Sequence, residues 1–98
     1  MEDIESDYLE IINHFGINNQ QRKLQEEVFE LQEAITKFEN GVGDIHEIEE
    51  EIVDVHILIN QLLEYYEVEP MDYLKLIQSK LHRTLERIES GYYENNFK

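Results

Sequence analysis

The chain has 98 residues, of which 23 are acidic and 8 are basic, so its formal net charge is -15. One compact domain is what this length allows, and 41% hydrophobic residues with a single proline and no cysteine exclude a disordered acidic tail, disulfides and thiolate zinc sites. The excess of negative charge argues against direct binding to nucleic acid or to anionic membranes, since both need clustered Lys and Arg.

Apolar residues recur at helical spacing almost throughout the sequence, which predicts an all-α fold. A short first helix is predicted over residues 4–15, because Gly16 then interrupts the pattern. A second helix of about 19 residues follows, capped by Asn18 or Asn19 and ending before Asn40. Its apolar stripe consists of Leu24, Val28, Leu31, Ile35 and Phe38.

Two further helices are predicted in the second half of the chain. Asp44 begins the third helix, with Glu47 in the position of a capping box. Its apolar stripe consists of Ile48, Ile52, Val55, Ile59, Leu62, Leu63 and Tyr66. Pro70 suits the first position of a fourth helix, which ends at Ser90 and Gly91. The core face of this helix consists of Leu74, Ile77, Leu81, Leu85 and Ile88.

These helices predict a four-helix bundle, with one short helix and three long antiparallel helices. The bundle forms a single domain over residues 1–98, with its core at 20–90 and a tail at 91–98. The third helix is apolar beyond one stripe, since Val53 and Ile57 point away from the main face. We therefore expect a homodimer or homotetramer, although these side chains would also fit beneath the short first helix.

Acidic pairs three residues apart are common here, so the face on which each pair lies is more informative than its spacing. At about 100° of rotation per residue, Glu27 and Glu30 flank the stripe of the second helix on the same side. Glu51 and Asp54 likewise share one flank of the third helix. Glu26 lies roughly opposite the stripe and should be solvated.

The second and third helices are expected to form an antiparallel hairpin, in which residues whose numbers sum to about 81–84 lie level with each other. Glu27 then pairs with Asp54, and Glu30 with Glu51 or Asp54. Such a concentration of charge is unfavourable unless a cation neutralises it. Carboxylate oxygens suit Mg²⁺ or Mn²⁺, and the alternative is a solvated acidic groove.

Four residues share one flank of the fourth helix, namely Tyr73, Lys80, Thr84 and Arg87. Antiparallel packing against the third helix would bring them level with the acidic cluster. A cation beside Lys and Arg is what a di- or triphosphate needs, because both neutralise charge on phosphate oxygens. Ordinary surface salt bridges are the alternative role for Lys80 and Arg87.

Three segments carry the motifs of a known family. Residues 23–31 (KLQEEVFEL) contain E-E-x-x-E after a lysine, and residues 51–54 (EIVD) are an E-x-x-D that opens an apolar helix. Residues 80–87 (KLHRTLER) form a basic segment near the C-terminus. In their order and separation, these segments resemble the MazG-like nucleotide pyrophosphohydrolases, members of the all-α NTP pyrophosphatase superfamily, over roughly residues 20–90.

The resemblance implies that Mg²⁺ is bound by four carboxylates, those of Glu27, Glu30, Glu51 and Asp54. It also implies hydrolysis of a nucleoside triphosphate between the α and β phosphates, giving a monophosphate and pyrophosphate and so clearing unwanted nucleotides. A carboxylate, either Glu27 or Glu30, is expected to orient or deprotonate the attacking water. The residues expected to contact the substrate are Lys23, Lys80, Thr84 and Arg87.

Two positions depart from the family pattern: Phe29 stands where a small residue is usual, and Thr84 where asparagine is common. Two other functions are compatible with the sequence, a non-enzymatic acidic interaction module or DNA mimic, and a nucleotide-binding protein without hydrolytic activity. The acidic start of the chain lacks the features of a signal peptide, and we expect a cytoplasmic protein.

Overall fold

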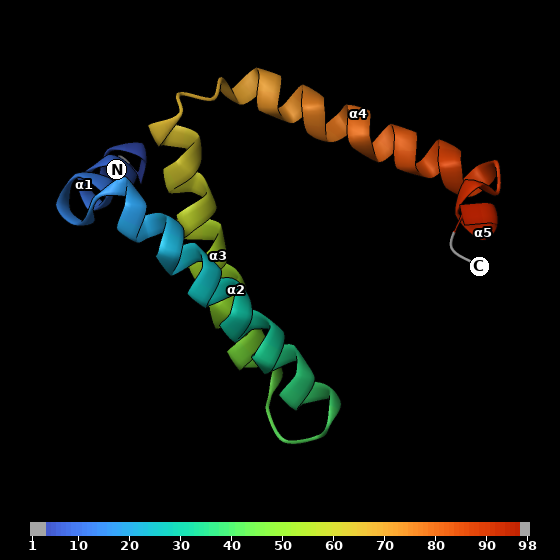
Figure 1. The fold of residues 1–98 in the computed structure, drawn as a ribbon, viewed down its shortest axis with the longest axis horizontal. Coiled ribbons are helices and arrows are strands. Elements are labelled where there is room, and N and C mark those ends of the chain that lie inside the picture. The colour runs from blue at the N-terminus through green and yellow to red at the C-terminus, as the bar shows by residue number, and fades with distance from the viewer. Residues whose placement is uncertain (1–3, 97–98) are drawn as a thin grey trace. The chain divides into compact units, whose positions relative to one another are not determined.

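The structure, a computed structural model, describes residues 4–96. It contains the helices α1 (Ile4–Phe15), α2 (Ile17–Glu39), α3 (Ile45–Tyr65), α4 (Pro70–Glu89) and α5 (Tyr92–Asn96), shown in Figure 1. The all-α prediction is confirmed. Helices α1 to α3 form one compact unit and α4 with α5 a second, and each is described by itself. None of the described helices has the length and apolar character needed to cross a membrane.

The junction between α1 and α2 differs from the sequence prediction. Only Gly16 separates the two helices, and it adopts φ 87°, a conformation that side chains disfavour. The predicted cap at Asn18 or Asn19 is wrong, because α2 begins at Ile17 and extends over 23 residues. The Asn19 side chain instead donates a hydrogen bond to the Phe15 carbonyl at 2.7 Å, which satisfies the end of α1.

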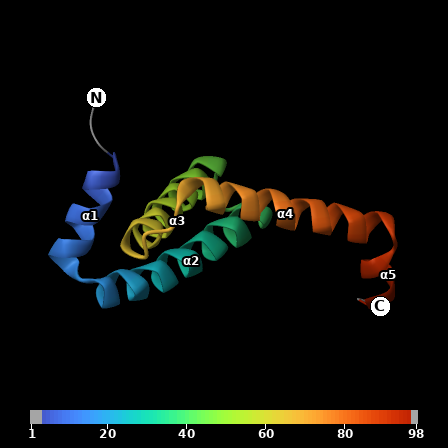
Figure 2. The same cartoon turned by 90° about the horizontal axis from the view of Figure 1, so that it is seen from above.

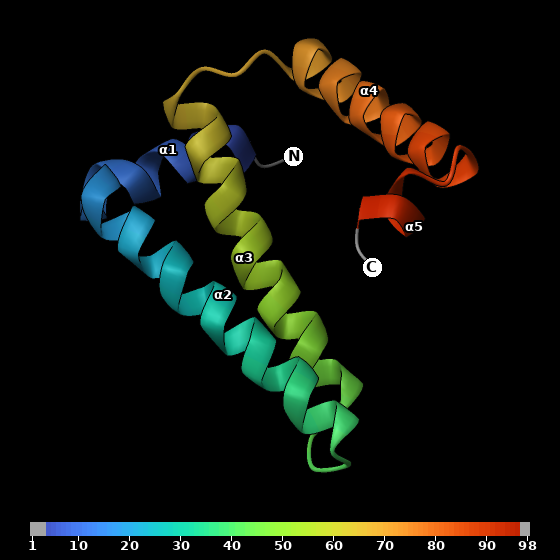
Figure 3. The same ribbon diagram turned by 45° about the vertical axis from the view of Figure 1, so that its right-hand side comes forward.

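A short loop reverses the chain between α2 and α3. Gly41 has φ 75°, and the Val42 N–H donates to the Lys37 carbonyl at 2.9 Å, which closes the end of α2. The predicted cap of α3 is confirmed, since the Glu47 N–H donates to Asp44 Oδ1 at 3.0 Å. The two helices then run antiparallel over most of their length (Figure 3).

The contact line of the α2–α3 hairpin is partly polar. Helix α1 packs against both arms at the end away from the loop (Figure 2). Along α2 the buried residues are Gln20, Glu27 and Ala34, which recur every seventh position. They face Leu58 and Gln61, the buried residues of α3. Among the described residues, the buried apolar side chains are Ile12, Ala34 and Leu58.

The predicted apolar stripes are only partly buried: Leu24 and Leu31 of α2 and Ile48, Val55, Leu62 and Leu63 of α3 are half-buried, whereas the other members are exposed. Val28 and Ile35 of α2 are each 39% exposed, and Ile52 of α3 is 52% exposed. Two helices touch along a narrow line, whereas these stripes are wide enough for a further layer. The hairpin therefore presents an exposed surface that we call the apolar face, composed of Val28, Ile35, Phe38, Ile45, Ile52 and Ile59.

The second unit begins as predicted and ends with an extra helix. Pro70 is the first residue of α4, and the Glu69 carboxylate accepts hydrogen bonds from the N–H groups of Met71 and Asp72. Taken by itself, this unit buries no residue of α4. Its predicted core face is exposed there, namely Leu74, Ile77, Leu81, Leu85 and Ile88.

The predicted tail contains α5, which periodicity did not reveal because the helix has five residues. Gly91, with φ 77°, allows the chain to turn after α4. The Arg87 guanidinium then lies 4.7 Å from the centre of the Tyr92 ring, a cation–π contact that joins the two helices.

Candidate metal centre

Three carboxylates converge midway along the α2–α3 hairpin. Glu27 from α2 and Glu51 and Asp54 from α3 each direct one oxygen into the cluster, and these oxygens all lie within 4.8 Å of one another. The antiparallel register places them there, because Glu27 lies level with Asp54, as the sequence predicted. We call these three residues the carboxylate triad.

The triad contains buried oxygens that lack hydrogen-bond partners. Glu27 is only 5% exposed, and its Oε2 atom is both buried and without a partner. Glu51 Oε2 is in the same condition. A buried carboxylate oxygen without a partner is costly, so this geometry requires a compensating proton or cation.

The Lys23 ammonium compensates part of this charge. Its Nζ atom lies 3.1 Å from Glu27 Oε1, and this hydrogen bond raises the pKa of Lys23. Burial opposes ionisation of Glu27, but its hydrogen bond with Lys23 and its carboxyl neighbours leave the Glu27 pKa below the ordinary value. Glu27 is therefore ionised, with one oxygen paired and the other available.

Glu51 is the member of the triad that holds a proton most readily. Burial, followed by the adjacent Glu27 carboxylate, raises the pKa of Glu51 to about 7. The pKa of the exposed Glu30 is also raised, first of all by hydrogen bonding with Glu27. Glu30 thus lies at the edge of the triad, close enough to Glu27 to interact with it, although it is not one of the three convergent ligands.

The spacing of the triad suits a small hard cation. Mg²⁺ takes oxygen ligands at about 2.1 Å, so oxygens on opposite sides of the ion are about 4.2 Å apart. Adjacent ligand oxygens are closer, about 3.0 Å apart, so the triad oxygens, which lie within 4.8 Å of one another, would move slightly inward around an ion. Three carboxylates leave other coordination positions for water or phosphate oxygens, which is typical of Mg²⁺ sites in proteins. The residues present therefore form a set that could hold a divalent metal ion.

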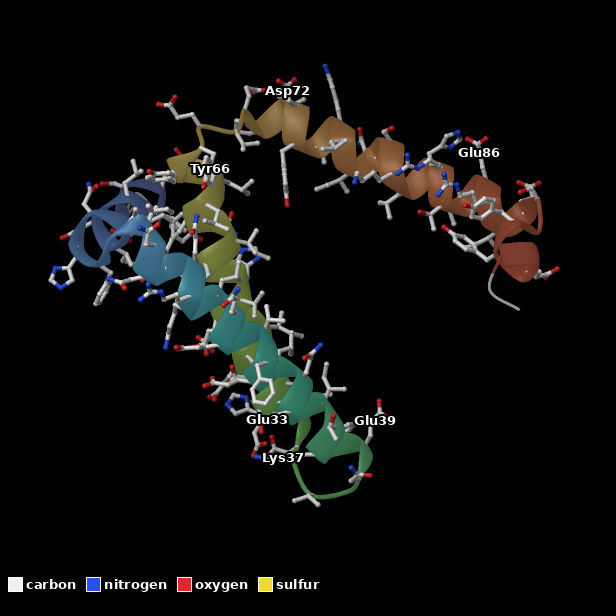
Figure 4. All side chains as sticks on the ribbon, viewed as in Figure 1. Glu33, Lys37, Glu39, Tyr66, Asp72 and Glu86 are labelled. Carbon is white, nitrogen blue, oxygen red and sulfur yellow. The ribbon has the colours of Figure 1, made fainter. Side chains whose placement is uncertain are left out.

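Two cavities adjoin the triad along one side of the hairpin. The first, of about 310 Å³, lies toward the loop and is lined by Glu30, Glu33, Ala34, Lys37, Glu47, Glu50 and Glu51. The second, of about 360 Å³, lies toward α1 and is lined by Gln20, Lys23, Glu27, Asp54, Ile57, Leu58 and Gln61. We call them the loop-end cavity and the amide-end cavity. Glu33 and Lys37 project from one side of the hairpin and Glu39 from the other (Figure 4).

The other predicted site residues fall into two groups. Lys23 contacts the triad directly, whereas Glu47 serves as the cap partner of Asp44 and lines the loop-end cavity. Lys80, Thr84 and Arg87 belong to the second unit, so their position relative to the triad stays a prediction. Within α4, the Thr84 hydroxyl donates to the Lys80 carbonyl at 2.9 Å.

The sequence interpretation missed a buried pair of amides. Gln20 Nε2 donates to Gln61 Oε1 at 2.8 Å, and the two residues are 8% and 2% exposed. A signal was present, because Gln20 lies one heptad before Glu27 and is level with Gln61 in the register that aligns Glu27 with Asp54. The contact line thus combines an amide pair and a carboxylate triad.

Comparisons of this chain with family models, with curated proteins and with solved structures gave no match.

Proposed function

We propose that the protein is a Mg²⁺-dependent nucleoside triphosphate pyrophosphohydrolase, which cleaves between the α and β phosphates to give a nucleoside monophosphate and pyrophosphate. The observation that carries the proposal is the triad, with its two buried carboxylate oxygens that lack partners. The resemblance of the sequence motifs to MazG-like enzymes supplies the substrate class. Mn²⁺, which also takes carboxylate and water ligands, would replace Mg²⁺.

The residues of the hairpin have different proposed roles in metal and phosphate binding. Glu27, Glu51 and Asp54 would hold the ion, and Glu30 would stand at the exposed edge of the site. A Mg²⁺ ion held by these residues would supply neutralisation of phosphate charge and polarisation of the phosphorus. Lys23, 52% exposed in its side chain, is positioned to contact a phosphate once the ion shares the charge of Glu27. Lys80, Thr84 and Arg87 are proposed as further phosphate contacts.

Glu30 is the best placed general base in this arrangement. It is exposed and lines the loop-end cavity, so water reaches it, whereas Glu27 is buried and committed to Lys23 and the ion. The raised pKa of Glu30 suits a group that accepts a proton from the attacking water. Glu27 would orient the attacking water rather than deprotonate it.

The same observation favours an enzyme over an acidic interaction module. A module or DNA mimic needs its charge on the surface, where it meets a basic partner. Here Glu27 is buried and Glu51 Oε2 has no partner, an arrangement that costs stability and gives nothing to surface recognition.

Pyrophosphate release tests the proposed function directly. Purified protein incubated with Mg²⁺ and a panel of canonical and modified nucleoside triphosphates is expected to release pyrophosphate from at least one of them, and to lose this activity when the metal is chelated. Tight binding of a nucleotide without release of pyrophosphate would identify a nucleotide-binding protein that has no hydrolytic activity. Absence of both binding and release across the panel would refute the proposal.

We also propose that the protein forms a homodimer or homotetramer through the apolar face of the hairpin. Three buried apolar side chains are too few to stabilise a domain of this size, while six large ones lie exposed on that face. Pairing two copies through this surface would bury it in both and leave the triads facing outward.

Adjacent residues of α3 allow a matched test of that interface. Ile52, 52% exposed, lies on the apolar face, and Val53, 48% exposed, lies on another side of the helix. Ile52→Glu is expected to convert the assembly to monomers in light-scattering measurements, because it places a charge in the apolar contact. Val53→Glu should leave the mass unchanged. If both variants dissociate, or neither does, the interface lies elsewhere.

A further inference from the structure

The amide-end cavity has a composition unlike the rest of the acidic groove. Its lining combines the apolar Ile57 and Leu58 and the Gln20–Gln61 pair with three charged residues, Lys23, Glu27 and Asp54. The loop-end cavity, by contrast, is lined by five glutamates against a single lysine. A neutral, partly apolar group extending from a metal-held triphosphate would therefore be accepted on the amide side and opposed on the loop side.

The amide pair leaves one donor and one acceptor unused. Each side-chain amide carries two N–H donors and one carbonyl acceptor, and the pair consumes one donor of Gln20 and the carbonyl of Gln61. The Gln20 carbonyl and the Gln61 amino group make no other hydrogen bond within residues 4–96. If the oxygen and nitrogen atoms of both side-chain amides exchange places, Gln61 donates to Gln20 instead. One donor and one acceptor of the pair still remain unused.

That pattern matches the edge of a nucleobase. A ring nitrogen and its neighbouring exocyclic group offer one donor and one acceptor, or the reverse, side by side. The cavity volume of about 360 Å³ lies within the range of small-molecule sites. Ile57 and Leu58 add apolar lining to the same cavity, which suits the face of a base.

We propose that the Gln20–Gln61 pair is a base-recognition subsite, which hydrogen-bonds the edge of the nucleobase while the triad holds the triphosphate. This inference rests on the proposed function for the identity of the ligand. It assigns a binding role to two uncharged residues, each of which lies seven positions along its helix from a member of the triad.

The test replaces both amides at once. The double variant Gln20→Leu/Gln61→Leu keeps the buried volume and leaves no orphaned amide, so folding is preserved better than in either single variant. Loss of two buried hydrogen bonds to the base is expected to raise KM for the nucleotide by about tenfold to a hundredfold. Inhibition by inorganic tripolyphosphate, which has no base, should be unchanged. The control is Gln21→Leu, whose exposed amide donates to the Tyr66 hydroxyl instead.

The outcomes separate this inference from the proposed function. An unchanged KM, or equal weakening of nucleotide and tripolyphosphate, would overturn the base subsite while leaving the pyrophosphohydrolase intact. If the wild-type protein releases no pyrophosphate at all, the proposed function fails, and a second measurement decides the subsite. In that measurement, a nucleoside monophosphate added with Mg²⁺ is expected to shift the side-chain amide NMR signals of Gln20 and Gln61. Unchanged chemical shifts of these signals at saturating nucleotide would refute the base-recognition subsite.

Discussion

Replacing Glu27 by glutamine is expected to abolish pyrophosphate release, with a loss of at least about a thousandfold in kcat/KM. The substitution keeps the shape of the side chain but removes the ionised oxygens that the buried site presents to the ion. Losing about 4 kcal/mol of transition-state stabilisation corresponds to that factor, and several kcal/mol is typical of metal-ion catalysis. The assay is pyrophosphate release at saturating Mg²⁺, with circular dichroism to confirm the helical fold.

The adjacent residue supplies the control for this experiment. Glu26 is exposed and points away from the contact line, so Glu26→Gln changes the net charge equally without touching the triad. It should retain nearly full activity. Asp54→Asn, from the other arm of the hairpin, should resemble Glu27→Gln. If Glu26→Gln were as damaging as the two triad variants, the assignment of faces would be wrong.

Mg²⁺ is expected to raise the melting temperature of the protein strongly, whether or not a nucleotide is present. An ion that binds only the folded state stabilises it by about 2.7 kcal/mol at a concentration of 100 Kd. For a domain of about this size, each kcal/mol shifts the melting temperature by about 4–8 °C, so a rise of about 10–20 °C should be seen in calorimetry. Glu27→Gln should lose most of this rise, because it removes a ligand that comes from the opposite arm to Glu51 and Asp54.

The pH dependence of the same melting curves tests the role of Glu51. Its folded-state pKa of about 7 lies above the ordinary value of 4.5, so the metal-free folded state binds the proton more tightly than the unfolded chain does. The contribution of Glu51 to the free energy of unfolding is therefore fully present below about pH 4.5, and it is lost as the pH rises through about 7. The rise in melting temperature caused by Mg²⁺ should increase over the same pH interval, because metal binding requires Glu51 in its ionised form.

Glu51→Gln provides the comparison, since it cannot titrate. Without metal, the difference in stability between wild type and this variant should change between pH 4.5 and 7 and then level off. A constant difference across that range would show that Glu51 titrates normally and that burial of its oxygen has no energetic consequence.

The register of the hairpin was the part of the fold that the sequence predicted best. Asp44 as the cap of α3 and the short loop before it determine which residues of the two arms lie level. From that alone, Glu27 is expected opposite Asp54, as found. A cap and a loop are local features, and local features are readable from sequence.

The exact contact line was not predictable in the same way. The apolar stripes of α2 and α3 suggested a core that includes Val28 and Ile52, which are exposed, whereas the hairpin buries Gln20 and Glu27. Hydrophobic periodicity reports every surface that a helix will cover, including surfaces that meet other chains or other units. Hydrophobic periodicity does not show which of these surfaces meets the other arm of the hairpin. Polar residues that lie on the contact line are therefore missed. The same reason applies to α4, whose apolar face has no partner within its own unit.

The single short loop between α2 and α3 has a kinetic consequence. Contacts across the hairpin join residues that are close in sequence near the loop, so the arms can associate rapidly from that end. The triad draws ligands from both arms and is complete only after they have closed. If Mg²⁺ binds as proposed, it would therefore act late on the folding route, where it would slow the opening of the hairpin and leave the rate of its formation almost unchanged.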